Sequence, residues 1–158
     1  GRDELTKAVA SRPTMEGGEA VPRQHRLAVV KAQPLAQGNR DGAVFCFPNM
    51  ALRHLRLGQA VSRAGDAFCR YGGEEFCVLL DCADVDAVKA YDQRLRLWLA
   101  QHSPQALGFA LSYSAGIDMR VLDSDTIEIM LQRADVALYQ AKAHGRGCTL
   151  AGPGRLSA

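Results

Sequence analysis

The sequence predicts an α/β (α+β) domain in which a central, mostly antiparallel sheet is flanked by helices. The first observation is the order of the predicted elements along the 158 residues, which is strand, helix, hairpin, helix, strand, helix and short strand. The second is the spacing of apolar residues at every third or fourth position in two long segments, a pattern typical of helices that cover a core. The third is the composition: 47% hydrophobic and 23% charged residues are typical of one ordinary globular domain.

The first half of the chain is expected to hold a helix and three strands. Before residue 24, Pro13 and the pair Gly17-Gly18 interrupt any helical period. Short apolar runs predict buried strands, and glycines beside Asn and Asp predict turns. In chain order these elements are a strand at Leu27–Val30, a loop at Gln37–Gly42, a helix at Asn49–Ser62, and a hairpin whose strands Phe68–Tyr71 and Phe76–Leu80 flank the break Gly72–Glu75.

Two amphipathic helices follow the hairpin, with a strand between them. Aspartates at the start of each helix are good N-caps, and proline or glycine marks each end. The expected boundaries are a helix capped by Asp81 or Asp84 and ended by Ser103-Pro104, a strand at Phe109–Ile117, and a helix capped within Asp123–Asp125 and ended by Gly145.

Charge and hydropathy exclude several function classes. Nineteen Lys and Arg residues against seventeen Asp and Glu residues give a net charge of +2, which argues against nucleic acid as the main partner. The apolar runs are far shorter than the roughly 20 residues that cross a bilayer, so we expect a cytoplasmic domain without membrane contact. We expect one domain over residues 1–158, excised from a longer multidomain protein, with a linker or N-terminal helix region at 1–24, a core at 25–151 and a tail at 152–158.

The hairpin is the segment whose residues best fit a ligand site. Gly72 and Gly73 allow a ligand to approach the backbone closely, and the adjacent carboxylates Glu74 and Glu75 can hold Mg²⁺, which in turn binds nucleotide phosphates. Taken alone, the segment is more typical of a glycine turn with solvated acids.

Three segments in order change that interpretation, because together they resemble the GGDEF family of diguanylate cyclases. They are the hairpin Arg70–Phe76 with the strand after it, Ser112–Ile117, and Ala134–Arg146. The resemblance runs from Asp3 to about Cys148 and is most specific in the last two thirds. It implies a sheet wrapped by helices, related to nucleotidyl cyclases and polymerase palms. In this family two domains, each with one GTP and Mg²⁺, face each other and make cyclic di-GMP.

The resemblance also implies roles for single residues. Glu74 stands at the metal carboxylate, with Glu75 beside it, and these are the catalytic positions. Lys142 and Arg146 stand at phosphate-binding positions, four apart at a helix end and so expected on one face. A basic helix end is also favoured by the helix dipole alone. The remnants of the GTP site are Asn39, Gly72, Gly73, Lys142 and Arg146.

Three positions depart from the family pattern. Counting without gaps from the hairpin, the metal aspartate is replaced by Lys31 and a guanine-binding aspartate by Pro48; the glycine of the family's N-terminal motif is Lys7. Lysine has no lone pair for Mg²⁺, and proline offers neither a carboxylate nor an N–H to guanine. We expect the Lys31 ammonium to lie within reach of Glu74 or Glu75 in place of the cation; the alternative is that Lys31 points to solvent and water screens the two acids.

The residues of a second ligand site of the family are retained. Arg63 and Asp66 form an Arg-x-x-Asp sequence at the distance from Gly72 where the family carries a product-inhibition site, and Arg94 stands where another arginine contacts that ligand. An arginine fork can bind the O6/N7 edge of guanine, while aspartate accepts from its N–H edge. A surface ion pair and an ordinary polar helix face are the alternatives.

These observations predict a degenerate GGDEF domain that binds cyclic di-GMP at Arg63, Asp66 and Arg94, needs no cofactor, and has little or no catalytic activity. Expected partners are cyclic di-GMP, GTP, other domains of the parent protein, and a second copy in a homodimer or ligand-bridged dimer. The alternative is an active diguanylate cyclase that uses Mg²⁺, with Asp41 or Gln33 compensating for the lost ligand. A third possibility is an interaction domain in which neither the catalytic site nor the cyclic di-GMP site is functional.

Overall fold

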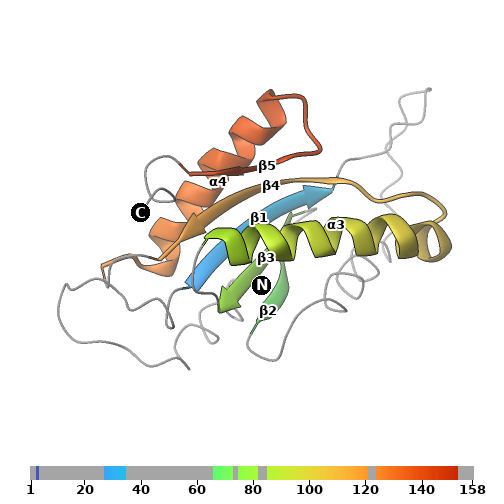
Figure 1. Ribbon diagram of the computed structural model, residues 1–158. Coiled ribbons are helices and arrows are strands. Elements are labelled where there is room, and N and C mark those ends of the chain that lie inside the picture. Colours follow the sequence, from blue (N-terminus) through green and yellow to red (C-terminus); the bar gives the residue numbers. More distant parts are fainter. Residues whose placement is uncertain are drawn as a thin grey trace.

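The computed structural model describes residues 3, 27–34, 66–72, 75–81, 85–120 and 124–152. In this part of the chain, five strands form one sheet in the order β2-β3-β1-β4-β5 (Figure 1). The bounds are β1 Leu27–Pro34, β2 Ala67–Gly72, β3 Glu75–Asp81, α3 Val85–Leu107, β4 Tyr113–Met119, α4 Ile127–Ala143 and β5 Thr149–Ala151.

The sheet is mostly antiparallel, as the sequence predicts. β1 lies at its centre and pairs antiparallel with β3 on one side and β4 on the other, while β2 and β3 form the hairpin. Only β5, of the described strands, pairs in parallel, with β4. The register places the Cα atom of Lys31 opposite Cys77 in β3 and opposite Gly116 in β4. The predicted fold class is confirmed.

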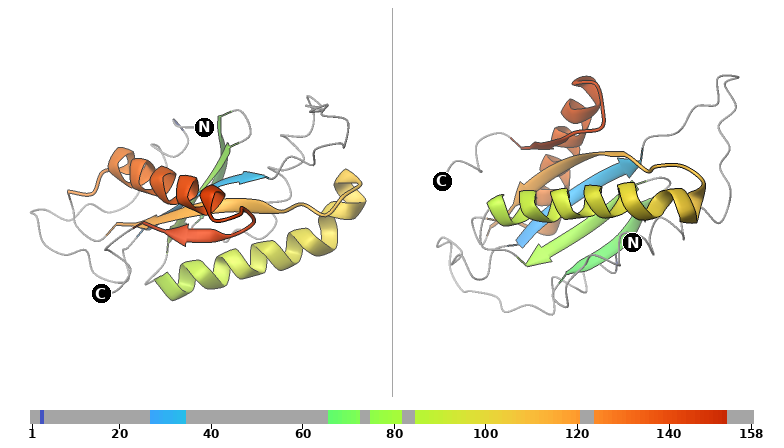
Figure 2. Two further views of the ribbon diagram at one scale, coloured as in Figure 1. Left: turned by 90° about the horizontal axis from the view of Figure 1, so that it is seen from above. Right: turned by 45° about the vertical axis from the view of Figure 1, so that its right-hand side comes forward.

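The two described helices cover opposite faces of this sheet (Figure 2). β3 is buried on both faces, and its residues alternate between them because successive strand side chains point to opposite sides. One face packs on α3 through a cluster that includes Val78, Leu80, Val88, Tyr91, Leu95, Leu99, Ala115 and Ile117. The other packs on α4 through Cys77, Leu79, Ile127, Met130, Leu131 and Ala134.

The first long helix differs from its predicted bounds. Asp81 belongs to β3 and is not a cap, and Asp84 lies outside the described residues. Pro104 does not end the helix, which continues to Leu107. A proline within a helix loses its own N–H bond to the carbonyl four residues earlier, but the three residues after Pro104 keep their N–H groups and continue the helix. The helix ends at Gly108, which has a φ of 84° and donates its N–H to the Pro104 carbonyl at 2.9 Å.

The last helix is capped one residue later than predicted. Thr126 is the N-cap, and its Oγ1 accepts from the Ile129 N–H at 3.3 Å. Asp125 is buried and instead accepts a bond from Arg133 at 3.0 Å. Gly145, with a φ of 104°, follows the C-cap, so the predicted helix stop is confirmed.

Of three further predicted elements, one has other bounds in the structure and two are not tested. The strand predicted at Phe109–Ile117 runs from Tyr113 to Met119. The loop at 37–42 and the helix at 49–62 lie outside the described residues. Among the described residues, no helix is both long enough and apolar enough to cross a membrane.

Candidate nucleotide-binding site

The glycine hairpin joins the two strands at one end of the sheet. Gly72 is the last residue of β2 and Glu75 the first of β3, and their Cα atoms pair across the turn. The register shifts between Arg70 and Gly72, an irregularity that bends a strand and redirects the residues after it. The Glu75 side chain is half-buried. Gly73 and Glu74 lie outside the described residues.

β1 places Lys31 beside this hairpin. Its Cα atom is opposite Cys77, two residues after Glu75 in the neighbouring strand. β1 runs past the predicted end at Val30 to Pro34, so Lys31 lies within the strand. The contact expected between its ammonium and Glu74 or Glu75 stays a prediction, because the Lys31 side chain and Glu74 lie outside the part of the chain that the structure describes.

A Mg²⁺ site built on two carboxylate positions does not fit the residues that the family resemblance assigns to it. That resemblance places Lys31 at the second position, and an ammonium has no lone pair to offer. The described residues contain no group of three or more His, Cys, Asp and Glu side chains able to hold a metal. Asn39 and Pro48, the two guanine-binding positions, lie outside those residues.

The two residues expected to bind phosphate, Lys142 and Arg146, lie at and just beyond the end of α4, so they do not share a helix face. Lys142 is half-buried in the last helical turn. Arg146 lies beyond the helix, is exposed, and has a left-handed φ of 64°. The helix ends before it because Gly145 turns the chain, and the Arg146 N–H then bonds back to the Ala141 carbonyl at 3.2 Å. The expectation of a shared helical face is therefore wrong.

Two of the three residues of the predicted cyclic di-GMP site are described, one just before β2 and one on α3. Asp66 immediately precedes β2 and is half-buried, whereas Arg94 is exposed on α3. Phe68, two residues after Asp66, packs against the cluster that contains Tyr91, and the Arg94 guanidinium lies 5.7 Å from the centre of the Tyr91 ring. The start of β2 and the middle of α3 therefore pack against the same apolar cluster. Arg63 lies outside the described residues.

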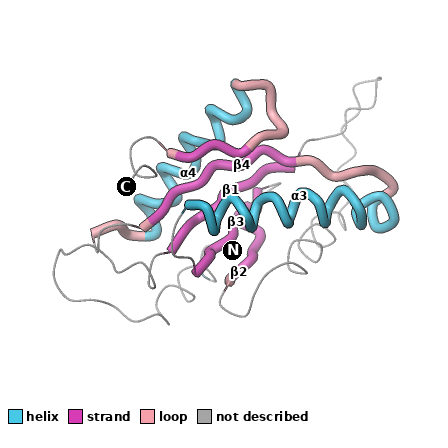
Figure 3. The backbone as a smooth tube through the Cα atoms, viewed as in Figure 1, coloured by secondary structure: helices cyan, strands magenta, loops and turns pink. Residues whose placement is uncertain are grey.

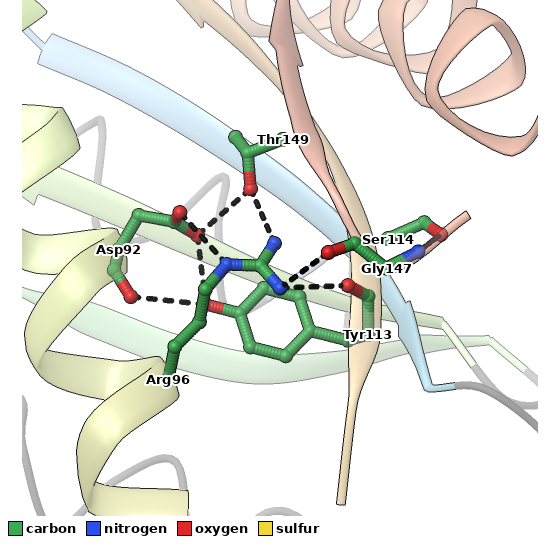
Figure 4. A network of polar contacts seen from close by, with 6 residues as sticks. All are labelled: Asp92, Arg96, Tyr113, Ser114, Gly147 and Thr149. Atoms are coloured by element: carbon green, nitrogen blue, oxygen red, sulfur yellow. Dashed lines mark hydrogen bonds and ion pairs between the residues drawn. The ribbon is translucent and has the colours of Figure 1, made fainter. Parts of the chain in front are cut away.

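A polar network that the sequence did not single out joins α3 to the C-terminal strands (Figure 4). Its centre is Arg96, whose Nε donates to Asp92 Oδ2 at 3.0 Å and whose Nη2 donates to Thr149 Oγ1 at 2.6 Å. The Tyr113 hydroxyl donates to Asp92 Oδ1 at 2.7 Å. Burial, together with the neighbouring Asp92 charge, raises the pKa of Tyr113 well above its ordinary value.

The spacing of the helix held a signal for this network. Asp92 and Arg96 are four residues apart, and each directly follows a residue of the buried stripe, Tyr91 or Leu95. Residues at that spacing are neighbours on one face, so an acid and a base beside the stripe predict a half-buried ion pair. The Arg96 side chain is 26% exposed and that of Asp92 11%.

Comparison with known proteins agrees with this architecture. Residues 52–148 match the GGDEF family, described as diguanylate cyclase, GGDEF domain. The response regulator PleD of Caulobacter vibrioides is 39% identical over 103 residues, which are 61% of this chain and 22% of PleD. The chain therefore spans about a fifth of that relative's length.

Two solved structures share the fold. The GGDEF domain of DgcB from Caulobacter crescentus in complex with c-di-GMP superposes with a TM-score of 0.70 at 22% identity, covering 95% of this chain and 86% of that one. The active GGEEF domain of a diguanylate cyclase from Vibrio cholerae gives a TM-score of 0.66 at 23% identity, covering 82% and 85%. With the family match over most of the described residues and the same sheet and helices, this chain belongs to the GGDEF domain family.

Proposed function

We propose that this chain is a degenerate GGDEF domain that binds cyclic di-GMP as a regulatory ligand and does not synthesise it. The ligand would occupy the surface formed by Arg63, Asp66 and Arg94. Lys142 and Arg146, as remnants of the GTP site, would hold the phosphates of GTP without turning it over. Such a domain passes ligand occupancy to other domains of its parent protein.

The observation that carries the proposal is the position of Lys31 in the sheet. The register opposite Cys77 supports the count that places Lys31 at the family's metal aspartate, beside the hairpin. Replacing a carboxylate with an ammonium removes a metal ligand and adds a repulsive charge. Two unit charges about 4 Å apart interact by about 4 kcal/mol at an effective dielectric constant of 20. A change of sign at this position therefore weakens Mg²⁺ binding by several kcal/mol.

The cyclic di-GMP surface is supported by the retained residues. Asp66 directly precedes β2 and Arg94 lies on α3, two elements that pack against the same apolar cluster, and the spacing from Arg63 to the hairpin is the one the family uses. The DgcB domain, which has the same fold, was solved with c-di-GMP bound. Arginine and aspartate supply the donors and acceptors that a guanine edge requires.

The test is to titrate cyclic di-GMP and GTP separately into the purified chain by isothermal calorimetry. We expect cyclic di-GMP to bind and Arg63→Ala to lower its affinity at least tenfold, because the variant loses a charged bidentate donor. Lys89→Ala is the matched control, since it removes an exposed positive charge from α3 without touching the proposed site. Unchanged binding in Arg63→Ala would show that the assigned surface is wrong.

The alternative is an active diguanylate cyclase, and one observation favours it. The Vibrio cholerae domain has a GGEEF hairpin, the sequence found here at residues 72–76, and is described as active. Product assays with GTP and Mg²⁺ or Mn²⁺ discriminate between the two functions. We expect negligible turnover; cyclic di-GMP that accumulates in the wild type and disappears in Glu74→Ala would establish the cyclase instead.

A further inference from the structure

The turn after α4 holds Arg146 in a backbone conformation that arginine rarely adopts. Three consecutive residues have positive φ angles: Gly145 at 104°, Arg146 at 64° and Gly147 at 65°. The loop that connects α4 to β5 contains this turn (Figure 3). Left-handed residues other than glycine are uncommon and persist where the surrounding structure holds them in place. The contacts around Arg146 should therefore explain its conformation.

Both backbone groups of Gly147 are held by side chains from other elements. Its N–H donates to Ser114 Oγ at 3.1 Å, and its carbonyl accepts from Arg96 Nη1 at 3.1 Å (Figure 4). On the other side, the Arg146 N–H bonds to the Ala141 carbonyl at 3.2 Å. The backbone that carries the Arg146 side chain is thus fixed on both sides.

The Arg96 guanidinium has several hydrogen-bond partners besides Gly147, and these fix its orientation. It donates to Asp92, to Thr149 and, through Nη1, to the Tyr113 carbonyl at 3.0 Å. The guanidinium carbon also lies 4.0 Å from the centre of the Tyr113 ring. A planar fork with this many partners has little freedom to turn. Its bond to Gly147 is therefore a fixed constraint on the turn.

We propose that Arg96 and Ser114 are positioning residues for Arg146. By holding Gly147 they set the direction in which the Arg146 guanidinium leaves the chain, toward the phosphates of a bound nucleotide. The inference rests on the phosphate-binding role of Lys142 and Arg146 proposed above. It adds that this role depends on a network anchored in α3 and β4, remote from the glycine hairpin in the sequence.

The test is a double-mutant cycle read by calorimetric titration of GTP. We expect Arg96→Gln to raise the Kd for GTP about three- to tenfold when Arg146 is present. In an Arg146→Ala background, the same change should leave the Kd unaltered, because the residue it positions is gone. Ser114→Ala should act in the same direction while sparing every contact of Arg96, and it decides the question if Arg96→Gln fails to fold.

Arg133→Gln is the matched control. This arginine is 25% exposed, close to Arg96 in exposure, and bonds Asp118 and Asp125 instead of the turn. We expect it to lower the melting temperature without altering the Kd for GTP. Equal weakening by Arg96→Gln and Arg133→Gln, a loss that persists without Arg146, or a wild type that does not bind GTP would each overturn the inference. Cyclic di-GMP titrated into the same samples tests the proposed function separately, since its binding does not involve this turn.

Discussion

Gly116 lies where α4 crosses β4, and replacing it tests how closely the backbone of the helix approaches the strand. A Cβ atom at this position would lie 1.9 Å from the Ala134 carbonyl oxygen and 2.4 Å from the Leu138 nitrogen. Both obstructing atoms belong to the helix backbone, so no side-chain rotation relieves the overlap. Gly116→Ala must instead displace α4 from the strand.

The size of the effect follows from these distances. Moving the Ala134 oxygen from 1.9 Å to the 3.4 Å at which ordinary contact begins requires a shift of about 1.5 Å. Such a shift separates α4 from the apolar face of β3 along the Cys77 and Leu79 cluster. Overpacking of a close-packed core costs about 1–3 kcal/mol, and a backbone obstruction belongs at the upper end. For a chain of this size, about 3 kcal/mol lowers the melting temperature by roughly 6–12 °C.

Thermal and urea unfolding of Gly116→Ala measure this loss, and Gly152→Ala is the control. A Cβ atom at Gly152 would meet its nearest neighbours at 3.6–3.7 Å, which is ordinary contact, so this variant should unfold like the wild type. A Gly116→Ala protein whose midpoint lies within 1 °C of the wild type, by the estimate of about 2–4 °C per kcal/mol, would refute the close approach of α4 to β4.

Three further outcomes are expected. Arg94→Ala should lower the affinity for cyclic di-GMP several-fold in calorimetry, whereas an unchanged Kd would remove Arg94 from the site. Tyr113→Phe should cost about 1–3 kcal/mol in urea unfolding, because Asp92 loses a buried donor. Since folding raises the pKa of Tyr113, its contribution is complete below about pH 10 and is lost above it, so the variant should lose stability less steeply in alkali. Lys31→Asp should restore Mg²⁺ or Mn²⁺ binding in a metal titration without restoring cyclase activity, because Pro48 still lacks a guanine-binding group; recovered turnover would contradict that reason.

The described strands could be predicted from the sequence because each carries a local signal. The apolar runs of β1 and β3 and the glycine break at Gly72 lie where the structure has strands and a turn. Helix ends were predicted less well, because they depend on contacts with residues of other segments and on backbone conformation, neither of which follows from residue type alone. Pro104 is tolerated within the last turn, and Asp125 is drawn away from capping by Arg133.

The sequence alone supports a statement about the candidate site only where the chemistry of a single side chain decides it. The Lys31 ammonium has no lone pair for a metal wherever it lies, and the register places the residue beside the hairpin. The conformation of Arg146 could not be predicted, because it depends on Gly147 being held by residues from α3 and β4. Contacts between elements far apart in sequence leave no local pattern.

Arg94 and Arg96 show how the same residue type on one helix acquires two different roles. A helix turns by about 100° per residue, so two residues two positions apart point in nearly opposite directions. Arg94 is exposed, with its guanidinium near Tyr91 on the surface proposed for cyclic di-GMP. Arg96 is half-buried and holds Gly147, beside the residue proposed for phosphate. The two roles proposed for these arginines, contact with a ligand for Arg94 and positioning of Arg146 for Arg96, thus depend on which elements pack beside each side of α3.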